Sequence, residues 1–209
     1  MTGVEKIRVM IADDHPVVCR GLSAIIRAER GMRVVGEASD GRQLVQMFRE
    51  QQPDVTLIDL RMPVMDGVEA VRAIRREFRN AGILILTTYK GDEDIFRALE
   101  AGAQGYLLKG MPPNELLDAI RNVHHGLRYL PPPVLETLAQ RPPNSELSSR
   151  ELQVLTLIVK GMSNKQIGET LGISQSTVKW HVNIVLTRLN VSDRTAAAVT
   201  ALRRGIVEL

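Results

Sequence analysis

The chain has 209 residues, of which 44% are hydrophobic and 24% are charged, a balance typical of water-soluble globular proteins. No stretch approaches the roughly 18 consecutive apolar residues of a membrane span, and neither a signal peptide nor a transit peptide is apparent, so we expect a cytoplasmic protein without a membrane partner. The single cysteine, Cys19, excludes an internal disulfide and a multi-cysteine metal site. At this length two modest domains are expected.

The net charge of +3 is unevenly distributed along the chain. Residues 1–128 contain 18 basic and 18 acidic residues, whereas residues 147–209 contain 8 basic residues against 4 acidic ones. The C-terminal part therefore carries the positive excess, which favours an anionic partner there, although a mild excess is also common on ordinary protein surfaces.

Residues 1–128 alternate short apolar runs with stretches of helical periodicity. The apolar runs, interpreted as strands, are residues 7–12, 32–38, 54–59, 83–88 and 104–109. Between them apolar residues recur at helical spacing, as in Val68, Val71 and Ile74. Strands and helices in alternation predict a parallel sheet with helices on both faces, and right-handed crossovers favour a doubly wound five-stranded α/β fold.

Residues 129–146 predict a linker between two domains. They contain five of the ten prolines of the chain, placed on both sides of one short apolar stretch, residues 134–138. Proline at both ends makes a connector semi-rigid, and the apolar stretch predicts a short helix in its middle.

Residues 147–209 predict an all-α domain of four helices. Ser148 with Glu151, and Ser163 with Gln166, have the spacing of a capping box and begin the first two helices. The other two are predicted to begin at Ser174, ending at Asn190, and at Ser192, ending near Gly205. Only residues 172–174 separate the second and third helices, a turn length typical of a helix-turn-helix domain.

Polar residues stand at the ends of four predicted strands, at the edge where ligands bind in doubly wound folds. Asp13 and Asp14 end the first strand, Asp59 the third, Thr87 the fourth and Lys109 the fifth. Three close carboxylates require a cation, and hard oxygen ligands suit Mg²⁺. Because a carboxylate can accept a phosphoryl group, the pattern predicts an aspartyl-phosphate site in which the metal and Lys109 offset negative charge.

Residues 7–125 resemble the receiver domain of bacterial two-component response regulators. The resemblance is carried by Asp13-Asp14, Asp59, Met62-Pro63, Asp66-Gly67, Thr87, and Tyr106 three residues before Lys109. It implies that a sensor histidine kinase phosphorylates Asp59. It also implies that Asp14, Asp59 and the backbone carbonyl of Arg61 ligate Mg²⁺, with Asp13 acting largely through a water, and that Thr87 and Lys109 bind phosphate oxygens.

Tyr106 has two interpretations. The resemblance implies a switch residue whose ring turns inward as the side chain of Thr87 is drawn to the phosphate. The alternative is a tyrosine with its ring on the core and its hydroxyl in water. A departure from the family lies nearby, because Lys109 precedes Gly110 where many receivers have proline, and this leaves the geometry of that peptide open.

The third predicted helix of the C-terminal part has two distinct faces. Its apolar face consists of Val178, Val182, Val185, Leu186 and Leu189, and the opposite face of Ser176, Lys179, Trp180, Asn183 and Thr187. Trp180, the only tryptophan of the chain, points away from the apolar face. Such a polar face fits insertion into a DNA major groove, with an ordinary solvated face as the alternative.

Residues 161–191 resemble the helix-turn-helix of LuxR-type regulators, and together with the receiver they make the chain similar to NarL/FixJ-type response regulators. The resemblance implies that Lys179, Trp180 and Asn183 contact bases of double-stranded DNA. The candidate phosphate contacts are Ser176, Thr177, His181, Lys165, Arg188 and the helix N-terminus at Ser163 and Asn164. His181 is equally consistent with a packed histidine, and Trp180 stands where a basic or amide residue is more usual.

The resemblance further implies a homodimer on two DNA half-sites, formed through the last helix, where residues 195–204 present small and apolar side chains. Phosphorylation would then change dimerisation or free the recognition helix, which is the third predicted helix of the C-terminal part. Self-dephosphorylation would be slow. Whether the receiver covers the recognition helix before phosphorylation is left open.

Two other functions compete with a phosphorylation-controlled transcription factor. A phosphatase or phosphotransferase working through an aspartyl phosphate is disfavoured, because Arg61, two residues after Asp59, cannot serve as a general acid. A DNA-binding protein that ignores phosphate is the second competitor, and DNA binding indifferent to phosphorylation would support it.

Overall fold

The computed structural model describes residues 6–88, 91–139 and 146–207. They form two compact units, the first of residues 6–88 and 95–135 and the second of residues 91–94, 136–139 and 146–207. No helix among the described residues is both long enough and apolar enough to cross a membrane.

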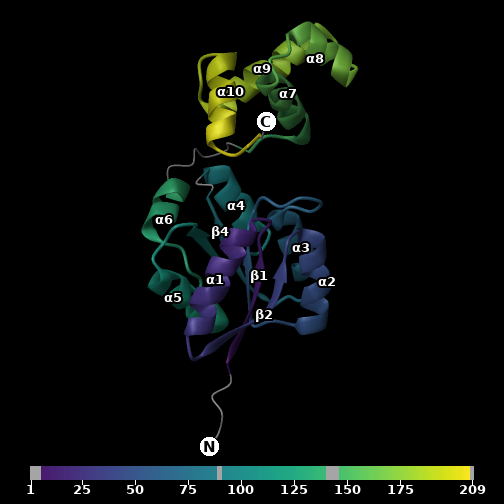
Figure 1. The fold of residues 1–209 in the computed structure, drawn as a ribbon. Helices are drawn as coiled ribbons and strands as arrows, with labels where there is room; N and C mark the ends of the chain where they lie inside the picture. The colour runs from purple at the N-terminus through teal and green to yellow at the C-terminus, as the bar shows by residue number, and fades with distance from the viewer. Residues whose placement is uncertain (1–5, 89–90, 140–145, 208–209) are drawn as a thin grey trace, which may run out of the picture. The chain divides into compact units, whose positions relative to one another are not determined.

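The first unit is built on a parallel sheet, drawn as arrows in Figure 1. Its strands are β1 Ile7–Ala12, β2 Met32–Ala38, β3 Val55–Ile58, β4 Gly82–Thr87 and β5 Gly105–Leu108. Their order is β2-β1-β3-β4-β5, and every neighbouring pair is parallel. This order reverses direction at β1, so the predicted doubly wound five-stranded α/β fold is confirmed.

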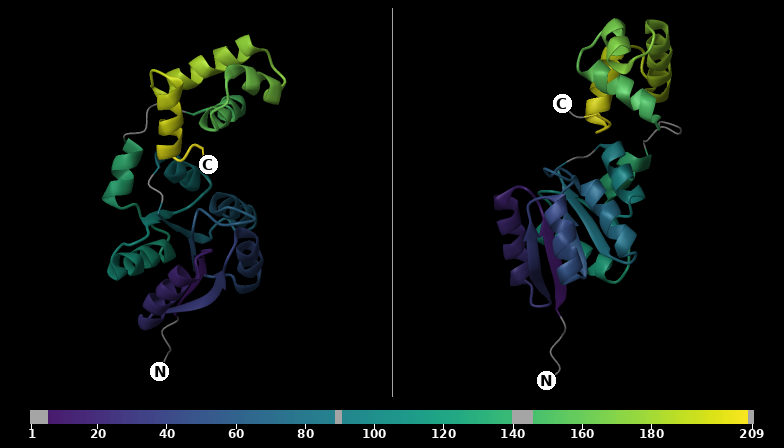
Figure 2. Two further views of the ribbon diagram at one scale, coloured as in Figure 1. Left: turned by 45° about the horizontal axis from the view of Figure 1, so that its top comes forward. Right: turned by 90° about the vertical axis from the view of Figure 1, so that its right-hand side faces the viewer.

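Helices cover both faces of this sheet, as the views in Figures 1 and 2 show. The helices are α1 Pro16–Ala28, α2 Gly41–Gln51, α3 Gly67–Glu77, α4 Asp92–Glu100 and α5 Pro113–His124. Ile26 of α1 and Ile120 of α5 pack with Val9, Leu57 and Leu84 of the strands in one apolar core. Both central strands, β3 and β4, are buried along their whole length, which accounts for their uninterrupted apolar runs.

The end of β3 is placed by backbone pairing. The N–H of Asp59 donates to the carbonyl of Ala12 over 2.8 Å, which sets Asp59 beside the end of β1. At the other end of the strand, Asp54 accepts a hydrogen bond from the backbone N–H of Arg8 at 2.7 Å. The register therefore brings the carboxylates that follow β1 and β3 to the same edge of the sheet.

The turn after Asp59 requires the residue types found at Asp66 and Gly67. The side chain of Asp66 caps α3 by accepting from the N–H of Glu69, in a complete capping box. A Cβ on Gly67 would lie 2.3 Å from the carbonyl oxygen of Asp59, so only glycine permits this approach. Between these landmarks, Val64 has φ of 68°, a left-handed conformation that β-branched residues rarely adopt.

The segment that follows α5 continues the first unit. The N–H of Tyr106 donates to the carbonyl of Tyr129, and the N–H of Tyr129 donates to the carbonyl of Gln104, both over 3.1 Å. This bridge extends the sheet beyond β5. Helix α6 Pro132–Ala139 follows and buries Val134, which matches the predicted short helix of the linker. Residues 140–145 of the predicted linker lie outside the described residues.

The second unit contains the four predicted helices, α7 Ser149–Val159, α8 Asn164–Leu171, α9 Gln175–Leu189 and α10 Arg194–Arg203. Both predicted capping boxes are present, and Ser174 and Asn190 bound α9 as predicted. The start of α10 differs from the prediction. Asp193, not Ser192, is its N-cap, because the carboxylate of Asp193 accepts from the N–H of Ala196 at 2.8 Å.

Two apolar clusters hold this unit together. Val154, Ile158, Ile167, Val178 and Val182 join α7, α8 and α9 in one cluster. Leu155, Val185, Leu189, Ala197 and Ala201 join α7, α9 and α10 in the other. Helix α9 contributes to both clusters, so its apolar face is the centre of the unit and its opposite face is left to solvent.

Candidate functional site

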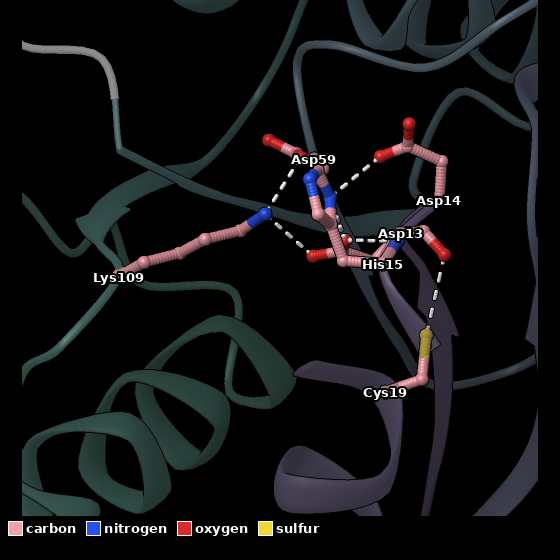
Figure 3. A network of polar contacts seen from close by, with 6 residues as sticks. All are labelled: Asp13, Asp14, His15, Cys19, Asp59 and Lys109. Carbon is pink, nitrogen blue, oxygen red and sulfur yellow. Dashed lines mark hydrogen bonds and ion pairs between the residues drawn. The ribbon is translucent and has the colours of Figure 1, made fainter. Parts of the chain in front are cut away.

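Three carboxylates meet at the edge of the sheet where β1 and β3 end (Figure 3). Asp13 and Asp59 are buried, with 3% and 4% of their surfaces exposed. One ligand atom from each of Asp13, Asp14, His15 and Asp59 can be chosen so that all four lie within 4.8 Å of one another. The structure thus brings together the three acids predicted from separate strand ends, and it adds an imidazole.

Lys109 supplies the positive charge at this edge. Its Nζ lies 2.7 Å from Oδ2 of Asp13 and 2.7 Å from Oδ2 of Asp59, and its side chain is only 13% exposed. Burial by itself would lower the pKa of this lysine, but the hydrogen bonds to the two carboxylates outweigh burial and raise the pKa. Lys109 is therefore a protonated ammonium that holds one oxygen of Asp59.

The other oxygen of Asp59 is left without a hydrogen bond. Oδ1 of Asp59 is buried and has no partner among the described residues. A buried carboxylate oxygen without a partner is costly, and a metal ion or a transferred phosphoryl group would satisfy it. This orphaned oxygen, with the carboxylates of Asp13 and Asp14 beside it, fits a hard divalent cation such as Mg²⁺.

Thr87 and Tyr106 lie on neighbouring strands next to this cluster. Thr87 is the last residue of β4, and the N–H of Lys109 donates to its carbonyl over 2.7 Å. Tyr106 pairs with Ile85 in the register of β4 and β5. Both side chains are completely buried, so the hydroxyl of Tyr106 is shielded from water. The side chain of Tyr106 is thus buried, in contrast to the alternative with a hydroxyl in water, and its role as a switch stays a prediction.

Helix α9 of the second unit has the two faces predicted from its sequence. Val178, Val182, Val185 and Leu189 are buried. Trp180 is 60% exposed, and Lys179, Asn183 and Ser176 are exposed as well. Because the buried face is already used by the unit's own core, the opposite face is available for a partner.

Hydroxyl groups organise the start of α9. Oγ of Ser174 lies 2.7 Å from Oγ of Ser176 and 2.8 Å from Oγ1 of Thr177, and it accepts from the N–H of Thr177. Two predicted phosphate contacts, Ser176 and Thr177, are thereby held at one helix N-terminus, where backbone N–H groups favour anions.

Comparison with known proteins agrees with this arrangement. Residues 9–121 match the family model of the response regulator receiver domain, and residues 145–201 match that of the bacterial regulatory proteins of the luxR family. The chain belongs to the response regulators with a LuxR-type DNA-binding domain. Response regulators of this kind are transcriptional regulatory proteins of two-component systems, so the predicted family and class of function are confirmed.

Relatives of this response regulator align along nearly its whole length. The transcriptional regulatory protein LiaR of Bacillus subtilis (strain 168) is 43% identical, covering 96% of this chain and 99% of its own. The nitrate/nitrite response regulator protein NarP of Escherichia coli (strain K12) is 40% identical, with coverages of 94% and 95%.

Solved structures of response regulators are similar as well. ChrA, of a heme-sensing two-component system, is 42% identical, with a TM-score of 0.57 over 96% of this chain and 98% of its own. RcsB of Salmonella enterica serovar Typhimurium, bound to a promoter in the presence of the phosphomimetic BeF₃⁻, is 26% identical, with a TM-score of 0.74 over 94% of this chain and 98% of its own.

Within this response regulator, Arg188 makes contacts that differ from the expected phosphate contact. Its Nη1 lies 2.6 Å from Oε2 of Glu151 and donates to the carbonyl of Glu146 over 2.6 Å. Glu151 is buried and also accepts from the N–H of Ser148, so Arg188 neutralises a carboxylate of the core. Its contact with DNA phosphate stays a prediction.

The remaining predicted DNA contacts lie in different environments. Lys165 is exposed on α8, whereas Oδ1 of Asn164 is 3.5 Å from Nη1 of Arg194. The ring of His181 packs edge-on against Trp180 at 4.7 Å, and its Nδ1 is buried with no partner among the described residues. These three residues stay predicted contacts.

His15 was missed by sequence reasoning. It directly follows Asp13-Asp14, and its Nδ1 lies 2.8 Å from Oδ1 of Asp14. Its position next to two predicted metal ligands was the available signal. A histidine at a helix start is usually without function, however, and only the fold places this ring among the carboxylates.

Proposed function

We propose that this response regulator accepts a phosphoryl group on Asp59 from a sensor histidine kinase, in the cytoplasm, and that the phosphorylated form binds promoter DNA as a homodimer. The observation that carries the proposal is that the two carboxylate oxygens of Asp59 have different contacts. Lys109 holds Oδ2 at 2.7 Å, and Oδ1 is buried without a partner among the described residues. Lys109 thus fixes the orientation of the carboxylate, and its second oxygen can still bind a metal ion or a phosphoryl group.

The transfer step is a displacement at phosphorus. The carboxylate of Asp59 attacks the phosphoryl group, an O–P bond forms, the N–P bond of the kinase phosphohistidine breaks, and its electron pair returns to that imidazole. Bound Mg²⁺ supplies positive charge that offsets the phosphoryl oxygens. The residues that would hold it are Asp14 and Asp59, with the carbonyl of Arg61 and with Asp13 through a water.

Lys109 and Thr87 would bind the transferred group. The ammonium of Lys109 is already 2.7 Å from Asp59, so it needs only to exchange a carboxylate oxygen for a phosphoryl oxygen. The hydroxyl of Thr87, at the end of β4, would bind another phosphoryl oxygen. Tyr106, buried on the adjacent strand, would retain its inward ring position in the phosphorylated state. Loss of the phosphoryl group to water would be slow, because Arg61 provides no general acid or base.

DNA recognition would use the exposed face of α9. Lys179, Trp180 and Asn183 would contact base edges in the major groove, and Ser176, Thr177 and Lys165 would contact phosphates. The two copies would meet through α10. Ala197 and Ala201 are buried in their own unit, so Val199 and Leu202 are the exposed apolar residues there that could face a second copy.

The test combines modification with DNA-site selection. Wild-type protein, Asp59→Asn and the matched control Asp118→Asn, an exposed acid on α5, are incubated with Mg²⁺ and a small phosphodonor. We expect wild type and Asp118→Asn to gain one phosphoryl group by intact mass and to select a sequence of two half-sites more tightly. Asp59→Asn should do neither.

Two results would overturn the proposal. Phosphorylation of Asp59→Asn to the wild-type extent would show that another residue is the acceptor. Equal site selection by all three proteins, with and without phosphodonor, would show that the chain binds DNA independently of phosphate, which is the competing constitutive function.

A further inference from the structure

The side chain of His15 has no role in helix capping. His15 is the N-cap residue of α1, yet its side chain makes no capping hydrogen bond, and Pro16 follows it. The ring instead lies among the carboxylates of Asp13, Asp14 and Asp59 (Figure 3). Its Nδ1 is 2.8 Å from Oδ1 of Asp14 and 3.1 Å from Oδ1 of Asp13.

The backbone fixes this position. The N–H of His15 donates to Oδ1 of Asp13 over 2.9 Å, so the residue is tied to the buried carboxylate beside it. The side chain itself is 64% exposed, at the solvent side of the cluster. It can therefore rotate about its own bonds toward a bound ion without disturbing the core.

The geometry points to His15 as a nitrogen ligand that strengthens the preference of this site for divalent transition-metal ions over Mg²⁺, and we propose that role here. The inference rests on the proposed metal site at Asp59 and concerns which ions that site selects.

The ligand spacing suits a metal ion. Because bonds from a small divalent ion to oxygen or nitrogen are about 2.0–2.2 Å, ligands on opposite sides of the ion lie roughly 4.2 Å apart. One ligand atom each from Asp14, His15 and Asp59, and one from Asp13, which would act through a water, can be chosen so that all lie within 4.8 Å of one another, about 0.6 Å more than that separation. An independent indication of a missing ligand is Oδ1 of Asp59, which is buried without a partner among the described residues.

The preference follows from the chemistry of imidazole. Mg²⁺ favours carboxylates, carbonyls and water, whereas imidazole is a good ligand for Co²⁺, Ni²⁺, Cu²⁺ and Zn²⁺. A site made of carboxylates alone binds divalent metal ions in their ordinary order of affinity. One added imidazole selectively strengthens the binding of transition-metal ions. His15 would thus change the ratio of affinities while leaving Mg²⁺ binding nearly as it is.

Co²⁺ and Mg²⁺ are the probes for the test, with full-length protein that carries no histidine tag. Calorimetry measures both affinities for wild type, His15→Gln and the matched control His124→Gln on α5. We expect His15→Gln to bind Co²⁺ about tenfold more weakly, the loss of roughly 1.4 kcal/mol of ligation, and Mg²⁺ within about threefold of wild type. His124→Gln should match wild type for both ions.

Proton NMR of the Co²⁺-loaded proteins provides a direct readout of ligation. A strongly shifted imidazole proton is expected in wild type and His124→Gln and is expected to be absent in His15→Gln. Equal Co²⁺ affinity and the same shifted proton in all three proteins would overturn the inference, and so would equal weakening of Co²⁺ and Mg²⁺ by His15→Gln.

An Asp59→Asn variant separates this inference from the proposed function. If Asp59→Asn binds both ions as wild type does, the metal site proposed at Asp59 is wrong. If Asp59→Asn weakens both ions while His15→Gln changes neither, the metal site stands and only the role of His15 is wrong.

Discussion

The two units of this response regulator hold their functional groups in opposite environments. In the receiver unit Asp13, Asp59, Thr87 and Tyr106 are buried at the end of a sheet. In the DNA-binding unit Lys179, Trp180 and Asn183 are exposed on one face of a helix. A buried charge needs a partner within the protein before any ligand arrives, which Lys109 provides, whereas an exposed face is satisfied by water. Internal contacts therefore identify the first site and reveal little about the second.

Among the described residues, the non-glycine residues with positive φ are Gln52 at the end of α2, Asn190 at the end of α9 and Val64 in the turn beside the acidic cluster. Val64, in the turn after Asp59, has φ of 68°, and an L-residue in this conformation costs about 1–2 kcal/mol. The non-glycine residue with positive φ described in the second unit is Asn190, at the end of α9, a residue type that tolerates the conformation. The turn beside the acidic cluster is held in place by the fold, whereas α9 ends as local preference dictates.

The largest change in unfolding free energy is expected for Lys109→Met, which tests whether burial distinguishes the two units. It leaves the buried carboxylates of Asp13 and Asp59 without their cation, so we expect the receiver unit to lose about 3 kcal/mol of unfolding free energy. Added Mg²⁺ should restore part of that loss, because a metal ion replaces the missing charge. Differential scanning calorimetry of the full chain measures both effects. Lys179→Met is the matched control, and an equal loss in that variant would show that burial does not distinguish the two regions.

A smaller effect is expected for Arg188→Met. It removes the partner of the buried carboxylate of Glu151, but the side chain of Arg188 is 37% exposed, so solvent screens part of the interaction. We expect the DNA-binding unit to lose about 1–2 kcal/mol of unfolding free energy. Trp180 fluorescence in a denaturant titration reports this unit. Unchanged stability with a weaker salt dependence of DNA binding would instead make Arg188 a phosphate contact.

The smallest effect on stability, and a large one on binding, is expected for Trp180→Ala. The side chain is exposed, so the unfolding free energy should change by less than about 0.5 kcal/mol. If Trp180 contacts bases, binding to the selected DNA should weaken by roughly 1–3 kcal/mol. Fluorescence anisotropy of labelled DNA measures it, with Leu152→Ala, an exposed apolar residue on α7, as the control. Equal affinity of both variants would remove Trp180 from the interface.

Much of the fold was predictable because it depends on local patterns. Residues 54–59 and 83–88 read as buried strands from their apolar runs, and β3 and β4 lie there, within a residue or two at each end. Ser148, Ser163 and Ser174 predicted three helix starts correctly, since capping depends only on residues within one turn. The start of α10 was misplaced by one residue, because Ser192 and Asp193 are both good caps and the chain path selects between them.

The candidate site was predictable for a related reason. In a parallel sheet the residues that follow each strand meet at one edge, so Asp13, Asp14, Asp59, Thr87 and Lys109 could be grouped from the sequence. Which of them touch was not predictable. That Lys109 bridges Asp13 and Asp59, and that one oxygen of Asp59 has no described partner, depends on the register of β1, β3 and β5.

The sequence by itself thus determined the two-domain organisation, the kind of fold in each domain and the residue types gathered at the carboxyl edge of the sheet, since these follow from periodicity, capping and strand order. Only the tertiary structure decided which long side chains meet. It placed His15 among the carboxylates, paired Arg188 with buried Glu151, and joined Tyr129 to β5. These contacts depend on the direction in which side chains point and on packing between separate elements of the fold. The spacing of residues along the chain determines neither.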